Sequence, residues 1–182
     1  MWKQSSYVGN TVDFAPILPE DDYFHPVAAD ANYTVVETEL FGFNIPAEDI
    51  QCNIYMLWHP VLKTMSVHIF VYRGARILRH HLDSDYFVEQ LYLPTVEDFS
   101  NFSVQMGSCA VRFKVVKPLD EILIEFDDPQ RNFNLHLKYN AALPPVGRPG
   151  GKHFTQLMKT SGNVTLDGSR YIIDGLYMRD RS

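Results

Sequence analysis

Cysteine, clustered basic residues and long apolar segments are scarce in this chain of 182 residues. Its two cysteines, Cys52 and Cys109, fall in predicted strands, and we expect both to be buried thiols, because buried cysteine behaves as a small hydrophobic residue. Lysine and arginine number 16 against 22 aspartates and glutamates, and no basic run occurs. This balance argues against a nucleic-acid partner, since contacts to phosphates need clustered positive charge.

No apolar stretch of the sequence approaches the roughly 20 residues that a membrane-spanning helix requires. The first residues contain no apolar signal segment and no small-residue cleavage site, so the sequence predicts no membrane span and a cytoplasmic location. Motifs for a nucleophilic triad, a P-loop or a dinucleotide-binding turn are also lacking. We therefore expect no cofactor.

The most metal-like stretch of the sequence is short and rich in histidine and aspartate. His81, Asp83 and Asp85 have the i, i+2 spacing that places side chains on one face of a strand. His80 would point to the opposite face. We interpret the stretch as a solvated strand end or as an acid–base group at a barrel mouth, and we expect no metal site.

Aromatic residues are abundant, at 13% of the chain with ten tyrosines and twelve phenylalanines, and such residues favour β-strands. Alternating apolar and polar residues, as in Asn132–Asn140, recur with turn signals about every ten residues. The pattern predicts about nine or ten strands in an all-β fold, either an antiparallel lipocalin-like barrel or a flattened β-sandwich. We expect residues 1–32 to form an irregular arm across one end of a β-domain of residues 33–182.

One predicted strand, Val61–Tyr72, has no fully polar face. One side of it is apolar, and the other side carries His68, Phe70 and Tyr72. A strand of this kind indicates contact with the barrel interior on one side and with another surface on the other.

The last part of the chain carries the most specific pattern. Asp167-Gly168 lies between two alternating runs and predicts a tight hairpin, and the second run leads into the charged segment Arg179-Asp180-Arg181-Ser182. This pattern resembles the segment that joins the two halves of the hydroxyneurosporene synthase (carotenoid 1,2-hydratase)-like family, which includes the AttH-like proteins. The matching positions are Gln156, Gly162, Val164, Gly168, Asp174, Gly175, Arg179, Asp180 and Ser182.

The resemblance implies a tandem of lipocalin-like barrels, of which this chain would be the N-terminal one. It also implies an apolar ligand of isoprenoid or lipid type, and an enzyme that hydrates or isomerises a C=C bond without a cofactor. In that family the catalytic residues lie largely in the second barrel, so a lyase activity would require a second barrel as partner. The junction between the barrels would involve Gln156, Arg179, Asp180 and Ser182.

Two residues are candidates for acid–base chemistry at such a site. An aspartate beside an apolar pocket has a raised pKa and can protonate an isolated double bond, which makes Asp174 a candidate catalytic residue. His68 is the second candidate, because its imidazole can transfer a proton near neutral pH. The candidates for an apolar ligand site are large aromatic residues, which would otherwise form the core: Trp58, Phe70, Tyr72, Phe113, Phe133 and Tyr139.

The sequence leaves three functions open, and each makes a different structural prediction. A continuous apolar cavity with one buried carboxylate would favour a hydratase or isomerase. The same cavity without a titratable group would favour a non-catalytic module that binds a lipophilic ligand. An exposed apolar patch near Tyr171, Ile173, Leu176 and Met178 would favour a structural half that pairs with a second barrel.

Overall fold

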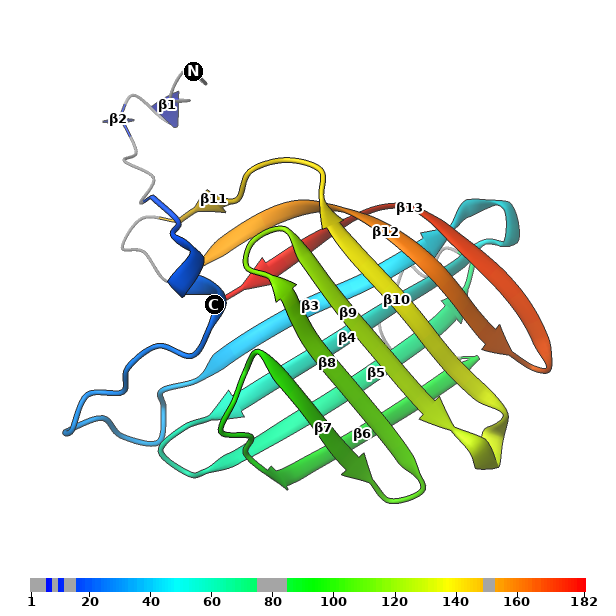
Figure 1. The fold of residues 1–182 in the computed structure, drawn as a ribbon, viewed down its shortest axis with the longest axis horizontal. Coiled ribbons are helices and arrows are strands. Elements are labelled where there is room, and N and C mark those ends of the chain that lie inside the picture. Colours follow the sequence, from blue (N-terminus) through cyan, green and yellow to red (C-terminus); the bar gives the residue numbers. More distant parts are fainter. Residues whose placement is uncertain (1–5, 8–9, 12–15, 75–84, 149–152) are drawn as a thin grey trace.

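The computed structural model of the protein describes residues 6–7, 10–11, 16–74, 85–148 and 153–182. Within these residues, ten antiparallel strands form a nearly closed barrel with almost no helix (Figure 1), which confirms the predicted all-β barrel. The barrel strands are β3 (Glu37–Ile45), β4 (Ile50–His59), β5 (Thr64–Arg73), β6 (Tyr86–Pro94), β7 (Asn101–Met106), β8 (Cys109–Lys117), β9 (Glu121–Asp128), β10 (Phe133–Ala141), β12 (Phe154–Leu166) and β13 (Ser169–Arg181). The short elements are β1 (Ser6–Tyr7), β2 (Asn10–Thr11), β11 (Val146–Gly147) and the 3-10 turns η1 (Pro19–Asp22), η2 (Pro46–Glu48) and η4 (Pro129–Arg131).

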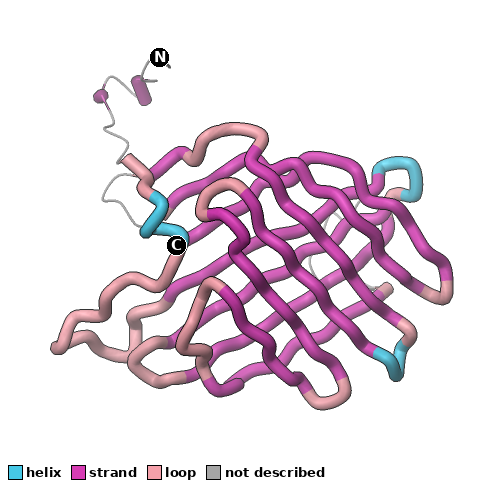
Figure 2. The backbone as a smooth tube through the Cα atoms, in the orientation of Figure 1, coloured by secondary structure: helices cyan, strands magenta, loops and turns pink. Residues whose placement is uncertain are grey.

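Barrel strands that are neighbours in the sheet follow one another in the chain, with one exception, the pairing of β3 with β13. Their order in the sheet is β6-β5-β4-β3-β13-β12-β10-β9-β8-β7, and β11 adds to β12. The first and last barrel strands, β3 and β13, join through the pairs Leu40–Asp180 and Glu39–Arg181. Among the described strands no pairing joins β6 to β7, so these two are the edges of the sheet. The tube in Figure 2 shows the path of the chain through these strands.

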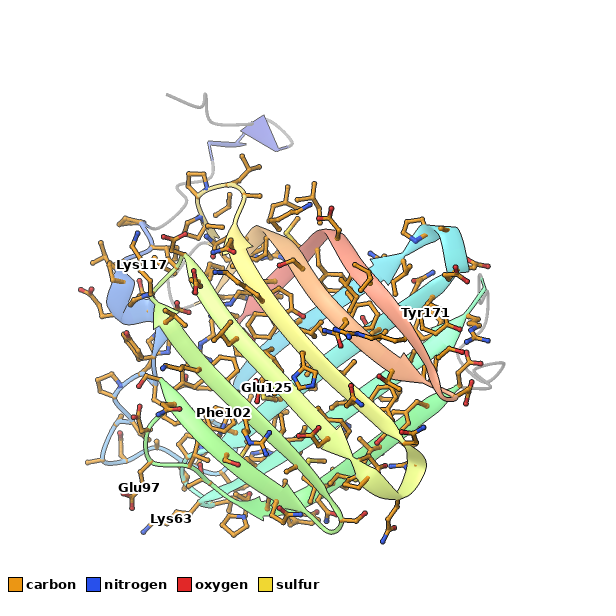
Figure 3. All side chains as sticks on the ribbon, turned by 45° about the vertical axis from the view of Figure 1, so that its right-hand side comes forward. Lys63, Glu97, Phe102, Lys117, Glu125 and Tyr171 are labelled. Carbon is orange, nitrogen blue, oxygen red and sulfur yellow. The ribbon has the colours of Figure 1, made fainter. Side chains whose placement is uncertain are left out.

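Alternation along the strands separates an interior face from an outer face. In β4 every second residue from Ile50 to Trp58 is buried, and in β10 the buried residues begin at Phe133 and end at Tyr139. Outward side chains such as Glu125 of β9 lie on the opposite side of the sheet (Figure 3). The strand predicted from the alternation in Asn132–Asn140 is confirmed by β10, because a period of two matches the pleat of a half-buried strand.

Side chains pack closely in the barrel interior. The ring centroids of Trp58 and Phe102 lie 6.1 Å apart, those of Phe102 and Phe113 lie 5.1 Å apart, and those of Phe41 and Tyr139 lie 4.9 Å apart. Such separations are typical of favourable aromatic contacts. Both cysteines are buried and free, as predicted for buried thiols, and burial raises the pKa of the Cys52 thiol.

Gly42 lies in β3 two residues beyond Leu40, the last β3 residue that pairs with β13. A Cβ atom at this position would overlap the carbonyl oxygen of Cys52 and the ring of Tyr177. From inside the barrel, the Tyr139 hydroxyl donates a hydrogen bond to the Gly42 carbonyl oxygen at 3.1 Å. The Tyr177 hydroxyl donates to the side chain of Asn53 on β4. The absence of a side chain at Gly42 therefore lets β13 pack directly against β3 and β4.

The N-terminal arm contacts one end of the barrel. Its turn η1 lies beside the C-terminus of the chain (Figure 1). Phe24 follows this turn, and its ring lies 5.5 Å from that of Trp58 and 5.1 Å from that of Phe99. The arm thus adds an aromatic ring to the core at the end where β3 begins and β13 ends.

Candidate functional site

Five charged side chains are buried together where the arm, the start of β3 and the end of β13 meet. They are Asp22 of η1, Glu37 and Glu39 of β3, and Arg179 and Arg181 of β13. The alternation of each strand places the four strand residues on the interior face. We call these five residues the buried ion network. Buried charges are tolerated when each is paired and hydrogen-bonded.

Arg179 is the centre of the buried ion network. Its Nη2 donates to Glu39 Oε1 at 2.6 Å and also to the carboxylate of Asp22, while its Nε donates to Glu39 Oε2 at 3.1 Å. The guanidinium lies 5.3 Å from the ring centroid of Phe41 and 5.1 Å from that of Phe154. Burial raises the pKa of Glu39, and the positive charge of Arg179 opposes this shift.

Arg181 extends the network toward the arm and the chain terminus. Its Nη2 donates to the carboxylate of Glu37 and, at 2.8 Å, to the carbonyl oxygen of Tyr23. Its Nη1 donates to the carbonyl oxygen of Thr38 at 3.3 Å. Because these bonds are made to backbone as well as to carboxylate, the network fixes the positions of three chain segments at one end of the barrel.

The four residues predicted for an interdomain junction divide into two groups. Gln156 is buried as the cross-strand partner of Arg179 and donates to the carbonyl oxygens of two loops, and the Ser182 hydroxyl lies 2.5 Å from the Thr38 hydroxyl. Asp180 points away from the interior and lies 3.1 Å from His153 Nε2. The structure therefore brings Gln156, Arg179 and Ser182 to the same barrel end.

Sequence reasoning did not identify Asp22, Glu37 or Glu39 as members of this network. The sequence does contain a pattern that indicates the two glutamates, because they alternate along β3 in step with Phe41 and Phe43 and so lie on the same interior face. A charged residue at an interior strand position requires a partner of opposite sign. No comparable pattern exists for Asp22, because it lies in an irregular segment far from its partner in the sequence.

The two predicted catalytic residues lie far apart in the sheet order. Asp174 is on the outer face of β13, its side chain is 70% exposed, and it pairs with Lys159. His68 is on the outer face of β5, where Nδ1 lies 3.2 Å from Glu89 Oε1. Burial lowers the pKa of His68, and the nearby Glu89 carboxylate opposes this shift. Asp174 thus lacks the desolvated surroundings that protonation of a double bond requires.

The six predicted ligand-binding aromatics lie on both sides of the barrel wall. Four of them are buried in the packed core: Trp58, Phe113, Phe133 and Tyr139. The other two, Phe70 and Tyr72, lie half-buried on the outer face of β5. Phe70 there lies beside His68, with ring centroids 6.3 Å apart and nearly parallel planes.

The outer surface of β3–β6 is rich in aromatic side chains and poor in charge. Rows across the sheet place Asn53 beside Phe70 and Phe87, and Tyr55 beside His68 and Glu89. The ring centroids of Phe70 and Phe87 lie 4.9 Å apart. We call this surface the aromatic face, and it is formed by Leu40, Tyr55, Leu57, His68, Phe70, Tyr72 and Phe87.

The outer surface of β7–β10 and β12 has the opposite character. Arg112 Nη1 lies 2.9 Å from Asp127 and 3.3 Å from Glu125, and Lys138 Nζ lies 2.8 Å from Glu121. We call this surface the polar face, and its outward residues include Ser103, Gln105, Arg112, Lys114, Glu125, Asp127, Asn134, His136 and Lys138. The two faces of one barrel therefore differ in composition.

Strand β13 carries a further row of exposed apolar side chains next to β3. Ile172 is 67% exposed, Leu176 53% and Met178 50%. Tyr171 is half-buried and lies beside Arg73, and Ile173 points into the core. An exposed apolar patch, which would favour pairing with a second barrel, is thus present near Leu176 and Met178. The patch includes the exposed side chain of Ile172, whereas that of the predicted Ile173 is buried.

The remaining sequence predictions concern metal binding and membrane insertion. His81 and Asp83 lie outside the described residues, and no cluster of metal-binding side chains occurs within the described part of the chain. None of the helical segments described is long and apolar enough to cross a membrane.

Comparison with known proteins yields one match. The model of a family described as a domain of unknown function, DUF7064, matches residues 18–182. This range includes η1, all ten barrel strands and every member of the buried ion network. No curated protein and no solved structure matches the chain.

Proposed function

This chain belongs to the DUF7064 family, and we propose that it acts as one barrel of a paired-barrel protein, binding a second antiparallel barrel through its aromatic face. The observation that carries the proposal is the contrast between the two outer faces. In the described part of the chain, the carboxylate of Glu89 borders the aromatic face beside His68 and belongs to no larger ion network, whereas the polar face has several ion pairs. The centres of protein interfaces are depleted in charge and enriched in tyrosine and phenylalanine.

Ring contacts on the aromatic face also favour an interface. Phe70 lies between His68 and Phe87, and the Tyr72 hydroxyl donates to Gln51 at 3.1 Å. Side chains held by such contacts lose little conformational freedom on binding, which reduces the entropic cost of association. The face is therefore suited to a specific partner surface.

The junction-like C-terminal segment supports the same proposal. Among the positions that carry its resemblance to the connection between the barrels of the hydroxyneurosporene synthase-like and AttH-like family, Gln156, Arg179 and Ser182 lie at the barrel end that holds the buried ion network. This network holds the last strand against the first one. A second barrel bound at the aromatic face would thus rest against a rigid part of the molecule.

A second candidate function is an apolar ligand held between the two barrels. It rests on one observation, that three predicted site residues, His68, Phe70 and Tyr72, lie together on the aromatic face. An isoprenoid or lipid-like molecule would then contact the outside of β5 rather than the packed interior. In a hydratase or isomerase of C=C bonds, the His68–Glu89 pair would be the proton-transferring group on this side.

Sedimentation velocity of the purified chain tests the pairing. We expect self-association, or a monomer that binds a hydrophobic dye, because a single barrel leaves the aromatic face uncovered. Phe70→Glu places a charge at the centre of this face and should abolish either behaviour. Ser103→Glu, an exposed position on the polar face, is the matched control and should change neither. A monomer that binds no dye would contradict the proposal.

Native mass spectrometry before and after organic extraction tests the second candidate. A lipophilic adduct that is present in the wild type, absent after extraction and lost in Phe70→Ala would support a ligand on the aromatic face. An adduct retained in Phe70→Ala would place the ligand elsewhere. An adduct-free protein would leave pairing as the function of this face.

A further inference from the structure

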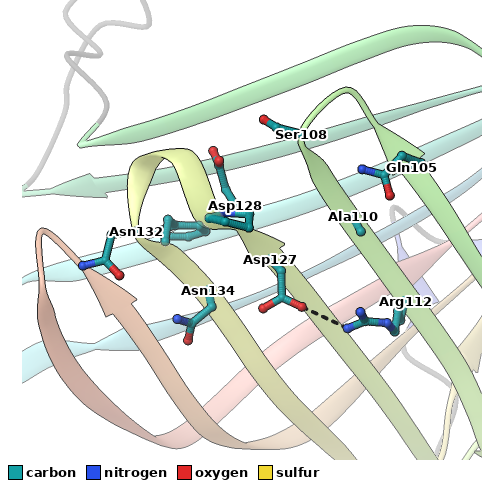
Figure 4. A pocket seen from close by; sticks show the side chains of 10 residues that line it. Gln105, Ser108, Ala110, Arg112, Asp127, Asp128, Asn132 and Asn134 are labelled. Atoms are coloured by element: carbon teal, nitrogen blue, oxygen red, sulfur yellow. Dashed lines mark hydrogen bonds and ion pairs between the residues drawn. The ribbon is translucent and has the colours of Figure 1, made fainter.

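A cavity of about 440 Å³ opens on the polar face, at the barrel end opposite the buried ion network (Figure 4). It lies between the β7–β8 turn and the turn η4. Its volume falls within the range of small-molecule sites, roughly 300–1,000 Å³. None of the residues that line it belongs to the aromatic face, so it is independent of the proposed pairing.

The shape of the cavity follows from one row of the sheet. Cross-strand pairing aligns Gln105, Ala110, Asp127 and Asn134 on β7, β8, β9 and β10. Adjacent strands lie about 4.8 Å apart, so the short side chain of Ala110 leaves a hollow between the amide of Gln105 and the carboxylate of Asp127. Larger side chains surround this hollow, as Figure 4 shows.

The polar groups around the hollow can both donate and accept hydrogen bonds. Within the described part of the chain, the side-chain amides of Asn132 and Asn134 have no hydrogen-bond partner, and Ser108 adds a hydroxyl. Asp127 and Asn134 are direct cross-strand partners, so their side chains start about 5 Å apart. A carboxylate and an amide at this spacing can bind two neighbouring hydroxyl groups of one molecule.

The charges of the cavity are compensated by its own side chains. Asp127 pairs with Arg112 at 2.9 Å, and Asp128 accepts hydrogen bonds from Arg131 at 2.5 Å and from Tyr86 at 2.8 Å. Burial raises the pKa of Asp128, but the bonds from Tyr86 and Arg131 outweigh it and hold the pKa below its ordinary value. A ligand with a net charge would therefore disturb existing pairs, whereas a neutral ligand would not.

From this arrangement we propose that the cavity binds a neutral polyhydroxylated molecule such as a monosaccharide or a cyclitol. Asp127 and Asn134 bind adjacent hydroxyl groups, and the amides of Gln105 and Asn132 reach hydroxyls at the rim. Apolar surface from Ala110, together with Pro129 of the wall, contacts the C–H face of the ring.

Two-dimensional ¹H–¹⁵N NMR of the folded chain tests this proposal. The probes are methyl α-D-glucopyranoside, methyl α-D-mannopyranoside, methyl β-D-galactopyranoside and myo-inositol, with glucose 6-phosphate and adenosine as charged and aromatic alternatives. We expect a neutral probe to shift the side-chain amide signals of Gln105 and Asn134 in the millimolar range. The same probe should leave the amide signals of the aromatic face unchanged.

Two variants separate the cavity from general effects on the fold. Ala110→Leu fills the hollow and should weaken binding at least about tenfold, equal to about 1.4 kcal/mol, and Asn134→Ala should do the same without adding bulk. Lys114→Leu adds the same side chain outside the cavity on the same strand and should bind like the wild type. Absence of shifts with every neutral probe would overturn the proposal, as would tighter binding of glucose 6-phosphate or adenosine.

Discussion

Arg179 of the last strand and Asp22 of the N-terminal arm form an ion pair in which both side chains are fully buried, although 157 residues separate them. The other oxygen of the Asp22 carboxylate accepts a hydrogen bond from the Leu119 amide at 2.6 Å. One carboxylate of an irregular segment thus connects the end of β13 with the β8–β9 turn. The arm is part of the folded barrel for this reason.

Removing Arg179 should be among the most destabilising changes in this protein. Arg179→Met leaves Asp22 buried without its cationic partner and leaves Glu39 with the more distant Arg181, whose Nε lies 3.4 Å from Glu39 Oε1. Breaking a buried pair in this way costs about 3–5 kcal/mol. Lys159→Met is the matched control, because it breaks an exposed pair with Asp174 and should cost less than about 1 kcal/mol. Urea unfolding measures both changes, and equal losses would contradict a structural role for the network.

Asp22→Ala should release the arm while the barrel stays folded. The Leu119 amide loses its acceptor, so its hydrogen exchange should accelerate more than that of amides in the middle of β9. Glu20→Ala, in the same turn but exposed, should leave the exchange rate unchanged. Hydrogen exchange followed by mass spectrometry or NMR reports both rates. Unaltered exchange at Leu119 in Asp22→Ala would show that the arm is held by other contacts.

Gly42→Ala should destabilise the barrel by about 3 kcal/mol or more, because overpacking against backbone forces the chain to shift. The added methyl group would overlap the Cys52 carbonyl oxygen and the Tyr177 ring. Gly107→Ala is the comparison, since nothing lies near its Cβ position and only its positive φ opposes the change. Thermal and urea unfolding compare the two. A similar loss in both variants would mean that β3 accommodates a side chain at Gly42.

The stability of the protein should depend on pH through His68. Burial lowers the pKa of His68 in the folded state, below the unfolded value of about 6.5. Folding therefore favours the neutral form of His68. The contribution of His68 to the free energy of unfolding is fully present above the pKa of the unfolded state, and it is lost as the pH falls through the lower pKa of the folded state. His68→Gln should remove this pH-dependent contribution to stability. Urea midpoints of both proteins between about pH 7.5 and 5 test it, and parallel curves would refute it.

The alternation of apolar and polar residues makes the central strands predictable from the sequence, and strands without this alternation are harder to predict. Strands such as β4 and β10 have one buried face, so apolar residues recur at every second position. Strand β6 lacks this regular alternation, because it is an edge strand with few buried residues. The outward aromatic residues of β5 lie on the aromatic face, and the predicted contact of this side with another surface stays a prediction.

The candidate sites were less predictable because they depend on contacts across the chain. The role of Arg179 follows from Asp22 and Glu39, and neither partner is near it in the sequence. The hollow at Ala110 is visible only when the registers of four strands are known. Sequence patterns describe neighbours along one strand, whereas these features are built from neighbours across several strands.

The up-and-down order of the barrel has a consequence for how the molecule assembles. Every pairing between barrel strands joins consecutive barrel strands of the chain, except the closure of β3 with β13. Hairpins can form quickly and independently, but this closure must bring together residues about 140 positions apart, and the entropic cost of such a loop grows with its length. The pairing of β3 with β13 should therefore form in the last step of folding, and the buried pair of Arg179 and Glu39 would slow its separation.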